Sequence, residues 1–315
     1  MTMKVNWLQG CATALVTPFT ASGELDEGCM RALIDFQLKC GVKLLVPCGT
    51  TGESATMTEE EDARVIKLTI EVAHRHRRGR VIAGTGSNST AAACEYSARA
   101  RKLGADAVLV VAPFYNKPTQ AGLYAHFHAV AKAVKGLPVV IYNVPGRTSS
   151  NISAETTLRL AHDVENIVAI KEASGDLSQI MEILRRRPAG FRVLSGDDAV
   201  TLPLIALGAD GLISVASNEH PKGMSRMVDM ALVGNWNEAR RLHFELLPLM
   251  EANFIESSPG PVKAAMAMMG LLEENFRLPL VPIQEKSRER IREVITELGL
   301  IKERSHAARA NRKAG

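Results

Sequence analysis

The sequence contains few aromatic residues, no paired-cysteine motif and no dominant sign of charge. Aromatics make up 4% of its 315 residues, too few for the interleaved stacking platforms that bind single-stranded nucleic acid. Its 38 basic and 34 acidic residues give a net charge of +4, so we expect neither a nucleic-acid partner nor a membrane surface. The five cysteines include no Cys-x-x-Cys motif, a usage typical of reduced thiols in the cytosol.

Segments that would target the chain or hold it in a membrane are also missing. Residues 1–10 (MTMKVNWLQG) lack the apolar core of a signal peptide. No run reaches the roughly 18 apolar residues that a membrane helix needs. We therefore expect a cytoplasmic protein.

Short apolar runs rich in Val, Ile, Leu and Ala recur eight times, each followed by a helix-like stretch. The runs are Cys11–Phe19, Lys43–Gly49, Arg80–Gly86, Ala107–Pro113, Pro138–Pro145, Ile167–Ser174, Arg192–Asp198 and Gly211–Ser217. Their starts lie 19 to 37 residues apart, the size of a βα unit, and continuous apolar runs are typical of parallel strands covered by helices. Eight such units predict an α/β fold, a closed (β/α)₈ TIM barrel, with an open doubly wound sheet as the alternative.

Two of the intervening stretches begin with recognisable helix signals. Thr58 and Glu61 have the spacing of a capping box, and residues 59–73 repeat apolar side chains at helical spacing. Ser153 is a plausible N-cap for a later helix. These signals support the alternation of strands and helices.

The alternating pattern ends near Gly234, and only helix-like stretches follow. These are Asn235–Ala252, Pro261–Glu274 and Glu285–Leu298. We predict a catalytic barrel over residues 1–233 and a small C-terminal helical domain over 234–302. Residues 303–315 are polar and mostly basic, so we expect a disordered tail rather than a nucleic-acid arm.

Lys171 lies inside the apolar run IVAIKEAS, where a lysine is almost never placed for stability. An ammonium group buried without a partner is costly, and a neutral lysine amine is the nucleophile that a Schiff base needs. The structural alternative is a buried ion pair with Glu172. Alternation argues against this pair, because neighbours on a strand point to opposite faces.

Tyr142 lies near the end of the preceding run, and the active sites of barrels gather at the C-terminal ends of their strands. Tyr142 should therefore lie near Lys171, where its hydroxyl can relay protons. A core tyrosine satisfied by one hydrogen bond explains this residue equally well when it is taken alone. Arg147 follows on the same loop and can hold a carboxylate in a bidentate manner, although an exposed loop arginine is the simpler explanation.

The segment Gly49–Glu53 (GTTGE) closes the second run, and its glycines and threonines suit the binding of a carboxylate, or an ordinary turn. Tyr115, Gly196 and Ile213 end or follow other runs at the same expected face. The sequence has no Walker loop, no Gly-x-Ser-x-Gly motif and no metal-ligand spacing, and Gly84–Gly86 lacks the third glycine of a dinucleotide fingerprint. We therefore expect no metal and no organic cofactor.

Several strings together resemble the superfamily of dihydrodipicolinate synthases and N-acetylneuraminate lyases, and more closely its dihydrodipicolinate synthase (4-hydroxy-tetrahydrodipicolinate synthase) family. The strings are GTTGESAT at 49–56, PFYNKPTQ at 113–120, YNVPGRT at 142–148, IKEASGD at 170–176 and LSGDDA at 194–199. The resemblance runs from about Gly10 to about Leu300. It implies a (β/α)₈ barrel with a C-terminal helical domain, assembled as a homotetramer built from a dimer of dimers.

The resemblance also implies roles for individual residues. Lys171 would form the Schiff base with pyruvate. Tyr142, Thr50 and Tyr115 would form a proton relay, with Tyr115 supplied by the other subunit of a dimer.

Substrate binding is implied by resemblance in the same way. Thr51 would contact the pyruvate carboxylate, and Arg147 would bind the carboxylate of the aldehyde substrate. Gly196 and Ile213 would line the site through their backbones.

The implied reaction condenses pyruvate with L-aspartate 4-semialdehyde to 4-hydroxy-tetrahydrodipicolinate, in the diaminopimelate and lysine pathway. The main alternative is a related pyruvate aldolase that acts on a sialic acid or a 2-keto-3-deoxy acid. A catalytically silent binding barrel would not need Lys171 and Tyr142. A phosphate-binding isomerase would need a glycine-rich loop after the seventh or eighth strand, which the sequence lacks.

Two features depart from the family pattern. Ser258 stands where relatives often carry asparagine, in the segment 256–263 (ESSPGPVK). The positions that match a lysine-inhibition site in feedback-inhibited relatives are Ser54, Ala55, Glu59, Asp62, Asn88, Ala92 and Phe114. Ala92 stands where sensitive relatives carry a glutamate, so an incoming lysine ammonium would lack its anionic partner. We therefore predict weak or absent inhibition by lysine.

Overall fold

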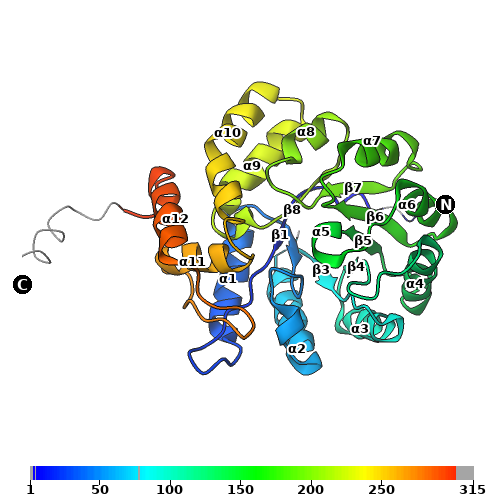
Figure 1. The fold of residues 1–315 in the computed structure, drawn as a ribbon, viewed down its shortest axis with the longest axis horizontal. Helices are drawn as coiled ribbons and strands as arrows, with labels where there is room; N and C mark the ends of the chain where they lie inside the picture. Colours follow the sequence, from blue (N-terminus) through cyan, green and yellow to red (C-terminus); the bar gives the residue numbers. More distant parts are fainter. Residues whose placement is uncertain (1–2, 4, 77–78, 303–315) are drawn as a thin grey trace, which may run out of the picture.

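The computed structural model describes residues 3, 5–76 and 79–302, so the predicted tail over 303–315 lies outside the described residues. The described chain forms a closed barrel of parallel strands that follow one another in chain order (Figure 1). The strands are β1 (Gly10–Ala14), β2 (Leu44–Val46), β3 (Arg80–Gly84), β4 (Ala107–Val111), β5 (Val139–Asn143), β6 (Ile167–Glu172), β7 (Arg192–Ser195) and β8 (Gly211–Ser214). Pairing of β1 with β8 closes the barrel, so the prediction of a TIM barrel is confirmed and the open sheet is wrong.

Helices surround the barrel and continue beyond it toward the C-terminus (Figure 1). The α-helices are α1 (Glu27–Lys39), α2 (Glu59–Ala73), α3 (Thr90–Leu103), α4 (Gln120–Ala133), α5 (Pro145–Thr148), α6 (Ala154–Asp163), α7 (Leu177–Arg186), α8 (Thr201–Ala206), α9 (Pro221–Leu232), α10 (Trp236–Ala252), α11 (Gly260–Met268) and α12 (Glu285–Glu297). Two short 3₁₀ helices are η1 (Ser54–Thr56) and η2 (Ala216–Asn218). None of the helices in the described part of the chain is long and apolar enough to span a membrane.

The helix signals read from the sequence have the expected structures. Thr58 and Glu61 form both hydrogen bonds of a capping box at the start of α2. The Ser153 hydroxyl accepts a hydrogen bond from the Thr156 N–H at the start of α6. The predicted helix over 261–274 is wrong at its end, because Gly270 adopts a φ of 75° just after α11, and few residues other than glycine tolerate that value.

The three C-terminal helices pack on one side of the barrel rather than apart from it. In sequence order, α10 packs on α9, and α12 packs on α10 and α11. Their apolar side chains share one buried cluster with Cys11 of β1 and Leu212 of β8. This shared core fixes the C-terminal helices against the barrel.

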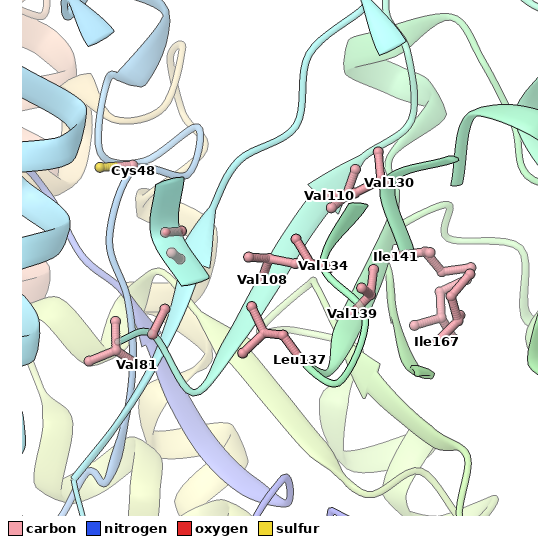
Figure 2. Packing of buried hydrophobic residues seen from close by; sticks show 14 of the residues in the cluster. Cys48, Val81, Val108, Val110, Val130, Val134, Leu137, Val139, Ile141 and Ile167 are labelled. Carbon is pink, nitrogen blue, oxygen red and sulfur yellow. The ribbon is translucent and has the colours of Figure 1, made fainter. Parts of the chain in front are cut away.

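The strands carry apolar side chains on both faces, which form one layer inside the barrel and another between the barrel and the helices. On β4 and β5, Val108 and Ile141 belong to an outer cluster that also contains Val130 of α4, and Figure 2 shows members of this cluster. Leu109 and Val140 instead belong to an inner cluster with members from all eight strands. Because successive side chains alternate in this way, each strand supplies both the barrel interior and the contact with the helices.

The pairing of β5 with β6 contains one register irregularity, between Val139 and Val140. On β6, Val168 and Ala169 both belong to the inner cluster, whereas Ile167 and Ile170 belong to the outer one. The irregularity thus shifts the alternation by one residue, and the next residue, Lys171, faces inward.

Candidate active site

A cavity of about 160 Å³ opens at the C-terminal ends of the strands. Six predicted site residues line it: Thr50, Thr51, Tyr142, Arg147, Lys171 and Gly196. They come from positions spread over about 150 residues of sequence, and the closed barrel brings them together. This is the face at which the active sites of TIM barrels lie.

Lys171 and Tyr142 form the centre of this cavity. They are paired across the β5–β6 register, and the Lys171 Nζ lies 4.1 Å from the centroid of the Tyr142 ring. Lys171 is 6% exposed and Tyr142 is 7% exposed, so both are largely shielded from water while facing the cavity. The amine therefore has one side against an aromatic ring and the other toward the space that a small ligand would occupy.

Glu172 does not pair with Lys171. Its carboxylate points away from the cavity and accepts hydrogen bonds from Asn143 (3.2 Å), the Ser174 N–H (2.8 Å) and Gln179 (3.4 Å). Burial raises the pKa of Glu172, while these hydrogen bonds oppose that rise. Among the described residues, no ion pair involves Lys171. The alternative explanation of this lysine, a buried ion pair with Glu172, is therefore wrong.

The GTTGE segment is a tight turn at the end of β2. The Gly52 N–H donates to the Gly49 carbonyl (3.0 Å), and the Glu53 N–H donates to the Thr50 carbonyl (3.1 Å). Thr51 is buried and Thr50 is exposed, and both line the cavity. The turn therefore presents two adjacent hydroxyl-bearing residues to the same space.

Arg147 reaches the cavity from α5, the short helix after β5. Its side chain is exposed and forms no ion pair within the part of the chain that the structure describes. A guanidinium without a carboxylate partner, at the mouth of a cavity, is suited to a carboxylate ligand.

Two predicted site residues do not line this cavity. Tyr115 is 89% exposed, has a φ of 74° and lies outside the cavity lining. Ile213 is buried in the inner cluster of the barrel and does not line the cavity. Within one copy of the chain, the site therefore lacks the tyrosine that the sequence analysis assigned to it.

Other lining residues were not anticipated. Asp197 follows β7, and Phe254 and Ser258 come from the segment between α10 and α11. Asp197 lies in the LSGDDA string, which was a usable signal. Ser258 lies in the family segment 256–263, which was also a usable signal, whereas nothing in the sequence pattern links Phe254 to the barrel, because it lies beyond the last βα unit.

A larger cavity of about 600 Å³ adjoins the first and shares Thr50, Tyr142 and Arg147 with it. Five of the positions considered for lysine inhibition line it, namely Ser54, Ala55, Glu59, Asp62 and Phe114, whereas Asn88 and Ala92 do not.

Three acidic residues line this larger cavity, and the two at positions considered for lysine inhibition, Glu59 and Asp62, are poor partners for an added cation. Glu59 already accepts hydrogen bonds from Arg99 (2.7 Å) and the Tyr96 hydroxyl (3.1 Å). Burial raises the pKa of Asp62 to about 7, so a large share of this carboxyl is neutral at neutral pH.

In residues 3, 5–76 and 79–302 we find no group of three or more His, Cys, Asp or Glu side chains arranged to hold a metal ion. The side chains that line the small cavity supply an amine, a phenol, hydroxyls, a guanidinium and the carboxylate of Asp197.

Comparison with known proteins identifies the family. The sequence profile of the Dihydrodipicolinate synthetase family matches residues 7–298. The 4-hydroxy-tetrahydrodipicolinate synthase of Koribacter versatilis (strain Ellin345) is 52% identical over 296 residues, which cover 94% of this chain and 97% of that protein.

Solved structures agree with the sequence comparison. A crystal structure of dihydrodipicolinate synthase from Aquifex aeolicus has a TM-score of 0.90 and 45% identity, covering 93% of this chain and 99% of that one. A pyruvate complex of the enzyme from Acinetobacter baumannii has a TM-score of 0.90 and 43% identity, covering 93% of this chain and 100% of that one. With this fold and these matches over nearly its whole length, the chain belongs to the dihydrodipicolinate synthetase family.

Proposed function

We propose that this protein is a lyase that condenses pyruvate with L-aspartate 4-semialdehyde to give 4-hydroxy-tetrahydrodipicolinate. The observation that carries the proposal is an isolated, buried lysine facing a small cavity beside a tyrosine, Lys171 and Tyr142, in a chain 52% identical to a synthase of that name. The catalytic barrel would span residues 1–233, with the helical domain over 234–302.

The first half of the reaction activates pyruvate. The neutral amine of Lys171 attacks C2 of pyruvate, and loss of water gives an iminium that acts as an electron sink. A proton then leaves C3, and the electron pair forms an enamine. The Lys171 side chain faces the cavity beside the Tyr142 ring, so the pyruvate carbonyl can reach its amine.

The second half joins the two substrates. The enamine C3 attacks the aldehyde carbon of aspartate semialdehyde, and the alkoxide that forms takes up a proton. The amino group of the same substrate then attacks C2 and displaces Lys171, which closes the ring and frees the enzyme. Each step is a proton or electron-pair transfer, so the mechanism needs no metal or organic cofactor.

The predicted site residues that line the cavity each have a part in this scheme. Tyr142 and Thr50 would relay the protons. Thr51 would bind the pyruvate carboxylate, and Arg147 at the cavity mouth would bind the carboxylate of the aldehyde. Gly196 would line the site next to Lys171.

Self-association completes the proposal. A tyrosine that is 89% exposed and held at positive φ is poorly explained in a single copy. We infer that Tyr115 of one copy completes the relay of another, in a homotetramer built from dimers. Sedimentation analysis combined with Tyr115→Phe tests this, since loss of activity without loss of assembly is expected.

One experiment tests the function directly. The purified protein is incubated with pyruvate and a panel of aldehydes that includes aspartate semialdehyde and sugar aldehydes, and turnover is compared. Preference for aspartate semialdehyde is expected. Equal or better turnover of sugar aldehydes would instead favour a sugar-acid aldolase.

A further inference from the structure

A fully buried ion pair joins the C-terminal helices to the turn that carries Thr50 and Thr51. The Lys263 Nζ of α11 lies 2.5 Å from the Glu53 Oε1, and both side chains are 0% exposed. These residues are 210 positions apart in sequence. Neither faces the small cavity in which pyruvate is proposed to react, so the pair needs a different explanation from that of Lys171.

All three hydrogens of the Lys263 ammonium have acceptors. Besides Glu53, the Nζ donates to the Thr17 carbonyl (3.1 Å) and the Asn275 carbonyl (2.6 Å). It also lies 4.8 Å from the centroid of the Phe19 ring, a favourable cation–π distance. Lys263 thus ties together the loop after β1, the turn after β2 and the C-terminal segment.

The turn itself has little freedom to move on its own. The Thr17 hydroxyl donates to the Gly52 carbonyl (2.6 Å), and a Cβ on Gly52 would lie 3.0 Å from the Leu15 carbonyl oxygen. Glu53 adopts a left-handed conformation (φ 56°), and its side chain is fully buried against Lys263. Holding the Glu53 carboxylate therefore holds the end of the turn that presents both hydroxyls.

We propose that Lys263 and Glu53 are positioning residues, which fix the Thr50–Thr51 turn so that the two hydroxyls meet pyruvate at the distance needed for binding and proton relay. The C-terminal helices would then be part of the catalytic apparatus, because they supply the cation that anchors the turn. This inference rests on the proposed function.

Loss of Lys263 should disturb the turn more at high pH than at low pH. Removing the lysine leaves a carboxyl group in a buried site, where the neutral form is favoured. At low pH a protonated Glu53 can stay inside. As pH rises, ionisation drives the carboxylate toward water, and the attached turn moves with it.

The test compares Lys263→Met with the wild type and with the double variant Lys263→Met/Glu53→Gln, which has no ionisable group at this point. We expect Lys263→Met to lower kcat/KM for pyruvate by roughly 10- to 10²-fold at pH 8, since small misplacements of positioning groups cost about that much. The ratio of variant to wild-type kcat/KM should fall from pH 6 to pH 9. In the double variant this ratio should not change with pH.

The titratable groups near the pair should not obscure the pH dependence of the kcat/KM ratio. Arg277, which lies near the pair, is bound to Glu61, whose pKa it lowers to about 2. Burial raises the pKa of the Cys29 thiol to about 11. Asp62, with a pKa raised to about 7 by burial, titrates in the measured range in every variant, so the ratio to the wild type removes its effect.

Arg288→Met is the matched control. It breaks the Arg288–Glu274 pair (2.6 Å), which lies within the C-terminal region and does not touch the turn. We expect lower thermal stability but wild-type kinetic constants. An equal loss of kcat/KM in this control would overturn the proposal, because the effect would then come from general loosening of the C-terminal helices.

Two further outcomes would also overturn the proposal: wild-type kcat/KM in Lys263→Met across the whole range, or a loss that does not vary with pH. If circular dichroism shows that Lys263→Met does not fold, Glu53→Met decides, since it keeps the size of the side chain but removes the acceptor through which Lys263 holds the turn, and wild-type constants there refute the proposal. The wild type is assayed first. Failure of the wild type to trap pyruvate would refute the proposed function, whereas a normal wild type with normal variants would refute only the positioning role.

Discussion

Gly196 has no room for a side chain, because the Lys171 side chain occupies the space beside it. A Cβ built on Gly196 would lie 2.9 Å from the Lys171 Cε, 3.1 Å from its Cγ and 2.8 Å from the Ala173 Cβ. Ordinary contacts between carbon atoms are about 3.5–4.0 Å. In Gly196→Ala the end of the Lys171 side chain must therefore retreat by roughly 0.6–1.1 Å.

This displacement sets the expected size of the effect. A shift of about 1 Å in a reacting group costs on the order of 10²-fold in rate, or about 2.7 kcal/mol of barrier. The overpacked core should cost about 1–3 kcal/mol of stability, less than the total of a typical domain, so the variant should still fold. We expect Gly196→Ala to be folded and to form the pyruvate imine about 10²-fold more slowly than the wild type.

The assay is borohydride trapping of the pyruvate adduct over time, read by intact-protein mass spectrometry, with circular dichroism as the check on folding. Gly28→Ala is the control, since Gly28 is exposed on α1 and an added Cβ meets only the Asp26 carboxylate at 3.5 Å. This control should trap at the wild-type rate. If folded Gly196→Ala also traps at the wild-type rate, Lys171 is not the group that reacts or its position does not matter.

Four other outcomes are expected. Pyruvate and borohydride should attach the adduct to Lys171, and peptide mapping that finds it on another lysine would reject the mechanism. Tyr142→Phe should lower kcat about 10²–10⁴-fold with the fold intact, because a proton relay is lost while the buried ring remains; near-normal kcat would remove the hydroxyl from the reaction. Arg147→Ala should raise KM for aspartate semialdehyde far more than it slows pyruvate trapping, and equal effects on both would contradict its role. Millimolar L-lysine should inhibit weakly or not at all, because Ala92 offers no charge and Glu59 is already paired with Arg99; steep inhibition curves would show that the site has other anionic partners.

The sequence by itself determined the architecture, because the signals for it are local. Eight apolar runs marked the strands, since a strand that faces the barrel interior on one side and helices on the other must be apolar throughout. The capping box at Thr58 fixed the start of α2 through contacts three residues apart. Lys171 was conspicuous for the same reason, as a charge in a run where none is needed for stability.

Only the tertiary structure decided which way Lys171 points. Alternation along β6 separates Lys171 from Glu172, but it does not say which of the two faces the barrel interior. That choice depends on the irregularity in the β5–β6 pairing, which puts both Val168 and Ala169 inside and so turns Lys171 inward as well. The register between two strands depends on both segments together, so it cannot be predicted from the sequence of either strand alone.

The same reason explains the remaining differences between expectation and structure. Tyr115 has the family motif around it but lies outside the cavity of its own chain, because the shape of its loop and not its sequence string sets where the ring goes. The contact between Lys263 and Glu53 spans 210 residues, and no periodicity relates two charges at that separation. Local patterns specify elements and reactive residue types, whereas close packing of distant segments decides which of those residues share a site.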